Sequence, residues 1–425
     1  MKMKNRGYRI KQSKSDKLKI CLLSYRSNPH CGGQGVYIRH LSRSLKDLGH
    51  HVEVISGPPF PQLDSDIQLH RLMNLDLYNP DQLFRTPSLN ELKNPINLME
   101  WLSVSTMGFP EPFTFGCRVF NYLHTKTNHF DIIHDNQSLS YGIQALSKRF
   151  PLIATIHHPM TVDRQIAVKS APNFYRKCQQ LRWYSFVGMQ KRVARSLSHI
   201  VTVSKCSAKD ISQSFKMNIQ HFRIAPNGIN TNLFYPIPQI KRIPYRLITT
   251  NSADTPLKGL KYLLEAVHTI RQNRPIELYV VGSPKKDGMI EYLVKQMNLS
   301  QSVHFLGRIT DKAFVEHYAQ ASIAVVPSLY EGFGLPAGEA MACGIPVIST
   351  TGGALPEVIG DAGMLIPPAN TKALINAICY FMDHPDDASK IGEAGYQRVH
   401  RLFTWKQSAE KTVEVYREAI ACFGK

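Results

Sequence analysis

Residues 19–57 read KICLLSYRSNPHCGGQGVYIRHLSRSLKDLGHHVEVISG, and this stretch decides the fold. An apolar run over 19–24 predicts a short buried strand, and apolar residues three or four apart over 36–48 predict a helix. Gly49 is a typical residue to end that helix, and a second buried strand is predicted at 51–56. Strand, loop, helix and strand in this order form a βαβ unit, which implies parallel strands with a right-handed crossover.

The same alternation continues through the first half of the chain. Buried strands are predicted at 131–134, 152–157 and 199–204, with helical stretches between them, so this half is a doubly wound α/β domain. Residues 225–236, APNGINTNLFYP, break the pattern with turn residues and prolines. We interpret them as a linker.

After the linker the alternation restarts and predicts a second doubly wound domain. Its strands are predicted at 245–250, 276–282, 303–306, 323–327 and 346–349, and its helices at 259–272, 290–297, 312–320 and 335–342. The fold class is therefore α/β, with two tandem Rossmann-like domains. Ligands of open α/β sheets bind beyond the carboxyl ends of the strands, so a cleft between the two domains is the expected site.

These elements predict the following division of the chain. A basic tail occupies 1–18, the first domain 19–224, the linker 225–236, the second domain 237–402, and 403–425 holds a last helix, 405–422, that crosses back to the first domain. The tail has no apolar stretch of the kind that a signal peptide needs. No apolar run in the sequence reaches the ~18 residues of a membrane-spanning helix.

Composition limits the function classes. The eight cysteines are scattered without a C-x-x-C pair, which argues against a zinc site or a disulfide framework and is typical of a reducing cytoplasm. The net charge of +19 would attract nucleic acid, an anionic membrane face or a phosphorylated substrate. No RNA-binding aromatic signature, zinc-finger spacing or basic zipper is present, so nucleic acid is not expected as a partner.

A glycine loop follows the first predicted strand. Gly32, Gly33 and Gly35 stand between that strand and its helix, where backbone N–H groups can approach a phosphate. The loop does not match the dinucleotide-binding fingerprint, because Ile38 stands where the third glycine belongs, and no P-loop lysine follows. The residues alone leave phosphate binding and a simple tight turn both open.

Two further positions lie where ligands would bind. His157 ends a predicted strand in ATIHHP, and its side chain either is satisfied locally or donates to a sugar hydroxyl or phosphate. Lys258 precedes Gly259 at a predicted helix start, where a cation is unfavourable for the helix dipole unless an anion offsets it. A solvated surface lysine is the alternative.

Residues 328–344, SLYEGFGLPAGEAMACG, carry two glutamates eight positions apart. Pro336 suits the first turn of a helix, so Glu331 is predicted on the preceding loop and Glu339 inside the helix. The two carboxylates are therefore not partners on one helix face. Helix amides could hold a diphosphate while the glutamates reach different parts of one ligand, or Glu339 merely complements the helix dipole.

Taken in order, these motifs resemble the retaining GT-B glycosyltransferases of family 4. The second half is similar almost throughout, and the glutamates fit the family's E-x7-E motif. The matching segments there are APNGINTNLF, PLKGLKYLLEAV, VVGSP, VHFLGRITD and PSLYEGFGLPAGEAMACGIPVISTTGGALPEVIGDAG. The match is sparser but ordered in the first half, where it comprises the glycine loop, IIHDNQSLSYG, ATIHHP and VTVSK.

The resemblance implies transfer of a hexose-type sugar from a UDP- or GDP-sugar to a hydroxyl of a glycan, lipid or small-molecule acceptor, in envelope polysaccharide or glycolipid synthesis. It implies no cofactor and no metal. It places Lys258 on the leaving diphosphate, Glu331 on the donor sugar and His157 on the transferred sugar. The donor-binding positions that it implies are Gly32, Gly33, Gly282, Gly307, Arg308, Gly332, Phe333, Gly334, Leu335 and Glu339, with Glu339 on the ribose and Gly307 and Arg308 near the base.

One departure from the family affects the site. Family members usually carry an arginine about five residues before the lysine, whereas no arginine stands between Leu247 and Lys258 here. Losing such a charge could cost several kcal/mol of transition-state stabilisation, about 3 kcal/mol for a typical single donor. We expect another cation, or Ser252 and backbone amides, to substitute.

The acceptor side is predicted in outline only. Residues 57–130 are rich in prolines and aromatic residues, including Trp101, and are predicted to shape the acceptor pocket. Residues 164–195 interleave basic and aromatic side chains, which predicts a helix that lies on an anionic membrane surface or has a solvated face. We expect a cytoplasmic enzyme, peripheral on the inner face of the plasma membrane. The alternatives are a GT-B sugar-nucleotide epimerase or phosphorylase-like enzyme, and a non-catalytic basic binding module.

Overall fold

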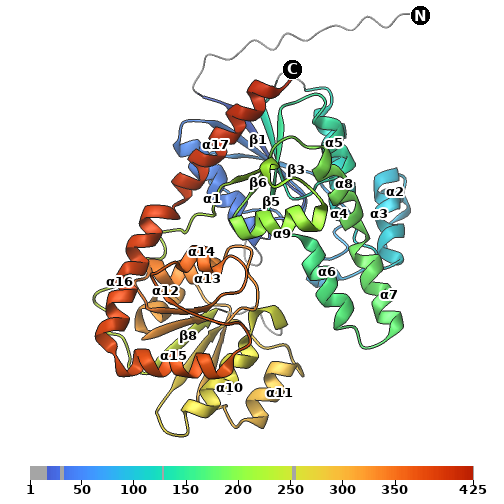
Figure 1. The fold of residues 1–425 in the computed structure, drawn as a ribbon. Helices are drawn as coiled ribbons and strands as arrows, with labels where there is room; N and C mark the ends of the chain where they lie inside the picture. The colour runs from blue at the N-terminus through green and yellow to red at the C-terminus, as the bar shows by residue number, and fades with distance from the viewer. Residues whose placement is uncertain (1–16, 29–32, 127–128, 251–254, 425) are drawn as a thin grey trace, which may run out of the picture.

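The computed structural model describes residues 17–28, 33–126, 129–250 and 255–424. Two parallel sheets stand at its centre, each with helices packed on its faces (Figure 1). The expected α/β class with two Rossmann-like domains is therefore confirmed. Because parallel strands are buried on both faces, they read as short continuous apolar runs, and this is why the sequence predicts most of them.

The first sheet has seven strands in the order β3-β2-β1-β4-β5-β6-β7. Neighbouring strands pair in parallel throughout. The strands are β1 (Lys19–Ser24), β2 (His51–Ser56), β3 (Gln68–Arg71), β4 (Ile132–Asn136), β5 (Leu152–Ile156), β6 (Ile200–Thr202) and β7 (Phe222–Ile224). The strand order reverses between β1 and β4, so the carboxyl ends of these two strands flank a switch point where ligands bind in such sheets.

The helices of the first domain fall into two groups. The first group connects the strands and comprises α1 (Gly33–Asp47), α4 (Glu111–Leu123), α5 (Tyr141–Leu146), α8 (Val187–Ser196) and α9 (Lys205–Phe215). The second group lies at one side of the domain, to the right in Figure 1, and comprises α2 (Leu89–Leu92), α3 (Pro95–Ser105), α6 (Met160–Lys169) and α7 (Phe174–Trp183). Short 3-10 turns stand at Pro80–Gln82, Tyr184–Phe186 and Ile219–His221.

The second sheet has six parallel strands in the order β10-β9-β8-β11-β12-β13, with its switch point between β8 and β11. Its strands are β8 (Arg246–Thr250), β9 (Glu277–Val281), β10 (Val303–Gly307), β11 (Ile323–Val326), β12 (Val347–Thr350) and β13 (Met364–Ile366). Its helices are α10 (Leu260–Ile270), α11 (Met289–Gln296), α12 (Asp311–Gln320), α13 (Leu335–Ala342), α14 (Leu355–Ile359), α15 (Thr371–Asp383) and α16 (Pro385–Leu402), with a 3-10 turn at Pro256–Lys258.

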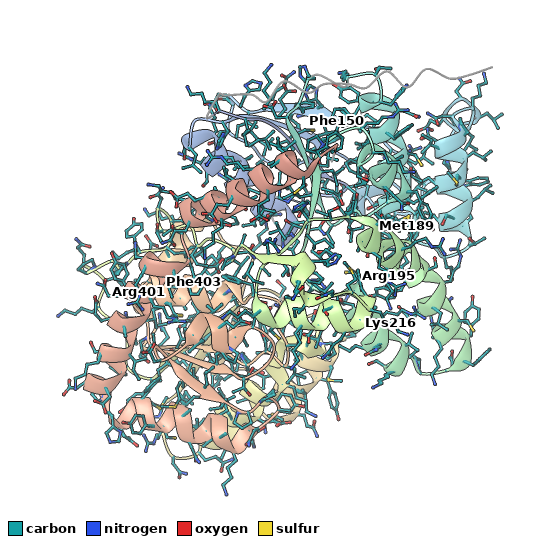
Figure 2. The ribbon with its side chains drawn as sticks, turned by 45° about the horizontal axis from the view of Figure 1, so that its top comes forward. Phe150, Met189, Arg195, Lys216, Arg401 and Phe403 are labelled. Atoms are coloured by element: carbon teal, nitrogen blue, oxygen red, sulfur yellow. The ribbon has the colours of Figure 1, made fainter. Side chains whose placement is uncertain are left out.

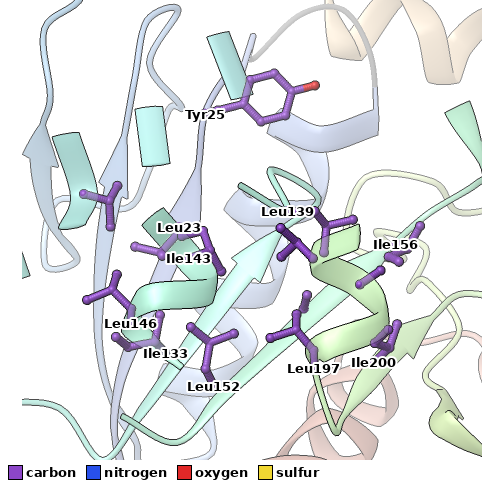
Figure 3. Close-up of a cluster of buried hydrophobic side chains, with 14 of the residues drawn as sticks. Leu23, Tyr25, Ile133, Leu139, Ile143, Leu146, Leu152, Ile156, Leu197 and Ile200 are labelled. Atoms are coloured by element: carbon purple, nitrogen blue, oxygen red, sulfur yellow. The ribbon is translucent and has the colours of Figure 1, made fainter. Parts of the chain in front are cut away.

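The core of the first domain lies between the sheet and the helices that connect its strands. Leu23, Ile133 and Ile156 from β1, β4 and β5 share one buried cluster with Ile143 and Leu146 of α5 (Figure 3). Burying each such side chain contributes roughly 1.5–3 kcal/mol. The carboxyl ends of the strands are thus fixed by a rigid base, which positions the loops that follow them.

Two crossings join the domains side by side. Ile229 in the linker pairs with Thr404, and its N–H donates to the carbonyl of Phe403 at 2.7 Å. Gly228 fits there because a Cβ would stand 2.3 Å from the backbone nitrogen of Trp405. The last helix, α17 (Trp405–Cys422), then packs along the first domain, where its Tyr416 hydroxyl lies 2.7 Å from Nδ1 of His134.

The segment 164–195 departs from expectation. The sequence predicts one basic, aromatic helix there, and this is wrong, because the chain breaks into α6, α7, a 3-10 turn and α8. Asn173 caps α7 by accepting from the N–H of Arg176, which starts a new helix after the Ala-Pro turn. The aromatic residues of the segment divide accordingly: Phe186 is buried in the domain, whereas Phe174 is largely exposed.

Candidate active site

Lys258 and Glu331 follow β8 and β11, the two strands that flank the second switch point. The chain directly after Lys258 turns tightly against the end of β11. Gly259 has φ +68°, and a Cβ there would stand 2.0 Å from the carbonyl oxygen of Pro327, so only glycine fits. This close approach sets the lysine beside the loop that carries the glutamate.

The two side chains form an ion pair. Nζ of Lys258 lies 2.7 Å from Oε1 of Glu331, and the hydroxyl of Ser328 donates to the same oxygen at 2.8 Å. The Lys258 and Glu331 side chains are 28% and 13% exposed, so the pair borders solvent. Oε2 of Glu331 has no hydrogen-bond partner among the described residues. An ammonium and a free carboxylate oxygen are therefore both available to a ligand.

The loop after Glu331 leads into the N-terminus of α13. Gly334 has φ +101°, and no side chain caps the helix there. Pro336 has no N–H, and the N–H groups of Ala337 and Gly338 donate to the carbonyl of Gly334, so among the described residues the N–H groups of Gly334 and Leu335 are left for a ligand or water. Phe333 anchors the loop, because its buried ring packs edge-on against Phe403 with centroids 5.6 Å apart. Phe403 lies just after α16, where Figure 2 labels it. Backbone N–H groups at a helix N-terminus attract anions, which suits a diphosphate.

Glu339 lies inside α13, on the side of the helix that faces Lys258. Its carboxylate is half buried and has no hydrogen-bond partner among the described residues. Burial raises the pKa of Glu339 to about 7, although the charge of Lys258 acts to lower it. A carboxylate held in this way without a protein donor is suited to accept hydrogen bonds from a ligand's hydroxyl groups.

In the first domain, Gly33 begins α1 just after the end of β1. A Cβ on Gly33 would meet nothing within 4 Å, whereas a Cβ on Gly35 would stand 2.2 Å from the carbonyl oxygen of Asn28. Gly35 is thus the glycine that the backbone requires, and Gly33 leaves open space at the helix N-terminus. Gly32 lies outside the described residues.

His157 follows β5 and lies beside the first switch point. Its backbone N–H donates to Oε1 of Gln137 at 2.8 Å, and its Nε2 lies 2.7 Å from Oδ1 of Asn136. Because an amide oxygen only accepts, Nε2 carries the proton and Nδ1 is an acceptor. Burial lowers the pKa of His157 to about 3, and the charge of His158 lowers it further. The imidazole is therefore neutral and held in one orientation.

The two domains meet directly at the glutamate loop. The carbonyl of Gly332 accepts from the hydroxyls of Ser204 and Ser207 at 2.9 and 3.0 Å, and Ser207 also lies within 3.1 Å of the carbonyl of His157. A Cβ on Gly332 would stand 2.9 Å from that same carbonyl. This contact brings Glu331 and His157 to opposite walls of one inter-domain site.

Two more contacts hold the loop in place. The carboxylate of Glu357 accepts from the backbone N–H groups of Lys205 and Cys206 at 2.9 and 2.6 Å, so it caps α9 from the other domain. The hydroxyl of Tyr330 donates to Oδ2 of Asp210 at 2.7 Å. The sequence analysis missed these residues. A serine after a strand signals a helix N-cap, but nothing in the sequence shows which distant residue completes it.

Comparison with known proteins identifies this architecture. The family model described as Glycosyltransferase Family 4 matches residues 31–233, and the one described as Glycosyl transferases group 1 matches residues 240–398. Over 409 residues the chain is 44% identical to MMP α-(1→4)-mannosyltransferase of Mycolicibacterium hassiacum, covering 95% of this chain and 99% of that protein. The chain belongs to the family 4 glycosyltransferases. The family expected from the motifs is therefore confirmed.

Solved structures resemble the whole glycosyltransferase. Sucrose-phosphate synthase from Thermosynechococcus elongatus is 25% identical, with 95% of this chain and 100% of that one covered and a TM-score of 0.72. Anabaena HepE in complex with UDP-glucose is 17% identical, with 94% and 100% covered and a TM-score of 0.69. The second likeness shows the fold alone. Together they confirm that the glycosyltransferase has the GT-B arrangement of two domains.

The remaining predicted donor positions of the glycosyltransferase lie beside β9 and β10. Gly282 and Gly307 form an isolated bridge, with the N–H of Gly307 donating to the carbonyl of Gly282 at 3.1 Å. Both have positive φ, +139° and +63°, and Arg308 after them is exposed. Among the described residues, no hydrogen bond or ion pair joins these three to Lys258 or Glu331. They stand at the same edge of the sheet: Gly282 follows β9, which is next to β8, and Gly307 and Arg308 lie at the end of β10, two strands from β8.

Two searches covered the described residues of the glycosyltransferase. Among them, no group of three or more His, Cys, Asp or Glu side chains is arranged to hold a metal ion. In the same residues, no helix has both the length and the apolar character needed to cross a membrane. Ser252, a candidate to replace the arginine that the family usually carries, lies outside the described residues.

Proposed function

We propose that this glycosyltransferase moves a mannosyl residue from a nucleotide-diphosphate mannose to a hydroxyl of a mannoside glycan, forming an α-(1→4) linkage. The observation that carries the proposal is the 44% identity, over nearly the full length of both chains, to a protein named as an α-(1→4)-mannosyltransferase. The site supports it, because an ammonium, unpaired carboxylate oxygens and helix amides surround one inter-domain space.

Each donor group has a matching protein group in this proposal. Lys258 and the N–H groups of Gly334 and Leu335 bind the diphosphate. Oε2 of Glu331 accepts from hydroxyls of the mannose, and Glu339 accepts from the ribose. His157 offers its neutral ring to the transferred sugar from the opposite wall. Positive charge aimed at the leaving diphosphate stabilises the transition state, because negative charge develops on the diphosphate there.

Retention of configuration follows from the anomers on the two sides of the reaction. Nucleotide-diphosphate mannose is an α-glycoside, and an α-linked product then keeps the configuration at C1. Glu331, the carboxylate beside the donor sugar, already shares Oε1 with Lys258 and Ser328, which lowers its power as a nucleophile. We propose a same-face displacement. The bond from C1 to the leaving phosphate oxygen breaks, the acceptor oxygen bonds to C1, and its proton passes to a phosphate oxygen of the donor.

The cationic charge comes from the protein in this proposal. Because the usual arginine is absent between Leu247 and Lys258, Lys258 carries more of the neutralisation than in related enzymes. We expect transfer to continue in the presence of EDTA, since Lys258 and the α13 amides match the diphosphate without a metal ion. Complete loss of transfer in EDTA, restored by a divalent cation, would contradict this part.

A donor panel tests the function. Thermal unfolding is measured with UDP, GDP and ADP, and with UDP-glucose, GDP-mannose and ADP-glucose, since a ligand at 100 times its dissociation constant adds about 2.7 kcal/mol to the unfolding free energy. We expect a mannose nucleotide to raise the melting temperature and to be consumed only when a mannoside acceptor is added. Consumption without an acceptor favours an epimerase. Stabilisation by glucose nucleotides alone, with glucosyl transfer, overturns the mannose assignment.

A further inference from the structure

Helix α3 has its charged residue inside and its apolar residues outside. Its sequence is PINLMEWLSVS, yet its only buried side chain is Glu100, which is 2% exposed. Glu100 pairs with Arg118 of α4 at 2.6 Å and accepts from the N–H of Leu75. Its apolar side chains face two separate hollows: Leu98 and Leu102, 39% and 52% exposed, line one, and Trp101 and Val104 line the other, a pocket between α3 and α7. Exposed apolar surface of this kind marks binding sites, and a buried ion pair can fix the orientation of the helix that presents it.

A pocket of about 370 Å³ lies between α3, α7 and the loop after β3. The residues that line it are mainly aromatic or apolar, with a few polar groups: Leu77, Tyr78, Phe84, Arg85, Trp101, Val104, Ser105, Met107, Gln179, Gln180 and Trp183. Its size falls within the range of about 300–1,000 Å³ typical of small-ligand sites. No residue of the proposed donor site lines this pocket.

Two residues at the pocket have an unusual backbone. Phe84 and Met107 have φ of +55° and +61°, although neither is glycine, and their side chains are 62% and 46% exposed. The left-handed conformation of Met107 ends α3, since the N–H of Gly108 donates to the carbonyl of Ser103 at 2.8 Å. Phe84 is held by its N–H, which donates to the carbonyl of Leu77 at 2.9 Å. Both side chains line the pocket and remain partly open to solvent.

The chemistry of the lining favours a sugar over an acyl chain. Tyr78 and Trp183 meet edge-on with ring centroids 5.5 Å apart, and Trp183 stacks on Phe109 at 5.1 Å, so their faces form a fixed aromatic surface. Among the described residues, the indole N–H groups of Trp101 and Trp183 and the side-chain amide of Gln180 have no hydrogen-bond partner. An acyl chain would bury these donors unpaired, at a cost of about 1–3 kcal/mol each. A sugar offers both an apolar face and hydroxyl groups.

The pocket lies beside residues that follow the end of β1. Tyr25 and Arg26 follow β1 directly, at the first switch point. The guanidinium of Arg26 pairs with Glu111 at 3.2 Å and lies 5.9 Å from the centre of the Tyr78 ring, which lines the pocket. Arg26 therefore links the lining of the pocket to the carboxyl end of β1, the edge of the sheet at which ligands of this fold bind.

We propose that this pocket is a distal acceptor subsite, which holds sugar units of the acceptor glycan remote from the reacting hydroxyl. The proposal rests on the proposed function, in which the acceptor is a mannoside glycan. It deepens that function by making the substrate an oligosaccharide chain and not a single sugar. Binding at the distal subsite then raises kcat/KM for long acceptors and leaves short acceptors unaffected.

The test compares Trp101→Ala with Leu102→Ala, a neighbouring change on α3 whose side chain lies outside the pocket. The kcat/KM values are measured with methyl α-mannoside and with an α-(1→4)-linked mannotetraose. We expect Trp101→Ala to lower the value for the tetraose about ten-fold, as loss of a buried Trp contact does, and to leave the monosaccharide within about two-fold. Leu102→Ala should change neither value. Equal loss for both acceptors, or no loss, would overturn the proposal.

Folding and the occupant are checked separately. The melting temperature of Trp101→Ala reports its fold, and Trp101→Phe should restore most of the lost kcat/KM because it keeps an aromatic face. Calorimetry of tetraose binding without donor, compared between the wild type and Trp101→Ala, isolates the contribution of the pocket. A wild type that binds tetraose more tightly than Trp101→Ala but transfers no mannose refutes the proposed function and not the subsite. Wild-type binding of a lysophospholipid that Trp101→Ala abolishes, without tetraose binding, would identify a lipid site and overturn the proposal.

Discussion

At the residue scale, the site depends on the contact between Lys258 and Glu331. Replacing Lys258 by Ala, or Glu331 by Gln, should cut turnover at least about a hundred-fold, because each change removes a group that meets charge or hydroxyls in the transition state. Steady-state transfer assays measure this loss. Lys261→Ala is a matched control, since that lysine is half exposed and pairs only with Glu265 on the surface of α10. Near-normal transfer by either site variant would contradict the assignment.

The protonation of Glu339 gives a second prediction. Its pKa of about 7, raised by burial, means that the donor-binding carboxylate is lost as the pH falls below 7, so the KM for the donor should rise there. The sign for stability is opposite. The folded state prefers the protonated form, so wild-type stability declines as pH rises from about 4.5 through 7.

Glu339→Gln separates these two effects. This variant cannot ionise, so it should melt at a higher temperature than the wild type at pH 8. It should bind the donor more weakly than the wild type above pH 7, and the difference should shrink as the pH falls toward 5. Thermal unfolding and donor titration over pH 5–9 measure both quantities. A variant that keeps wild-type donor affinity would remove Glu339 from the ribose site.

Gly33 and Gly35 make a matched pair. Gly33→Ala should leave the melting temperature unchanged, because nothing lies within 4 Å of the added carbon, but it should weaken donor binding if the diphosphate approaches there. Gly35→Ala should destabilise the fold, because its Cβ would collide with the carbonyl of Asn28. Donor affinity lost without loss of stability in Gly33→Ala supports the diphosphate assignment, and wild-type affinity contradicts it.

At the element scale, α9 joins the two domains through a cap that comes from outside its own domain. Glu357→Ala removes an acceptor for two backbone N–H groups, so we expect a loss of about 1 kcal/mol in the unfolding free energy and a raised KM for the donor. Denaturant unfolding and steady-state kinetics measure the two effects. Glu393→Ala, an exposed glutamate bonded to Gln397 on α16, is the control. Unchanged kinetics in Glu357→Ala would show that this cap does not fix the position of the two domains around the donor site.

Elements were predictable where their own residues determine them. The strand at 51–56 and the helix at 405–422 were predicted with the bounds that the structure shows, because an apolar run and a 3.6-residue periodicity are local signals. The short strands β3 and β7 were missed, since each has three or four residues and is partly exposed. Helix α3 was missed as well, because its apolar side chains face outward around the buried Glu100.

At the scale of the whole molecule, two switch points face each other across the inter-domain site. The order of motifs along the chain was enough to predict two doubly wound domains and the side of each sheet that binds ligands. The contacts between the domains, such as Gly332 with Ser204 and Ser207, could not be predicted, because they depend on how two separately folded units meet. The roles assigned to the site residues stay predictions until ligands are measured.

The configuration of the first product tests the central claim most directly. The enzyme is incubated with the mannose nucleotide and a mannoside acceptor, and the anomeric carbon of the new linkage is read by NMR before secondary products form. Same-face displacement from the α-linked donor predicts an α-(1→4)-linked mannoside. A β-linked product, or mannose nucleotide left intact in the presence of acceptor, would contradict the account.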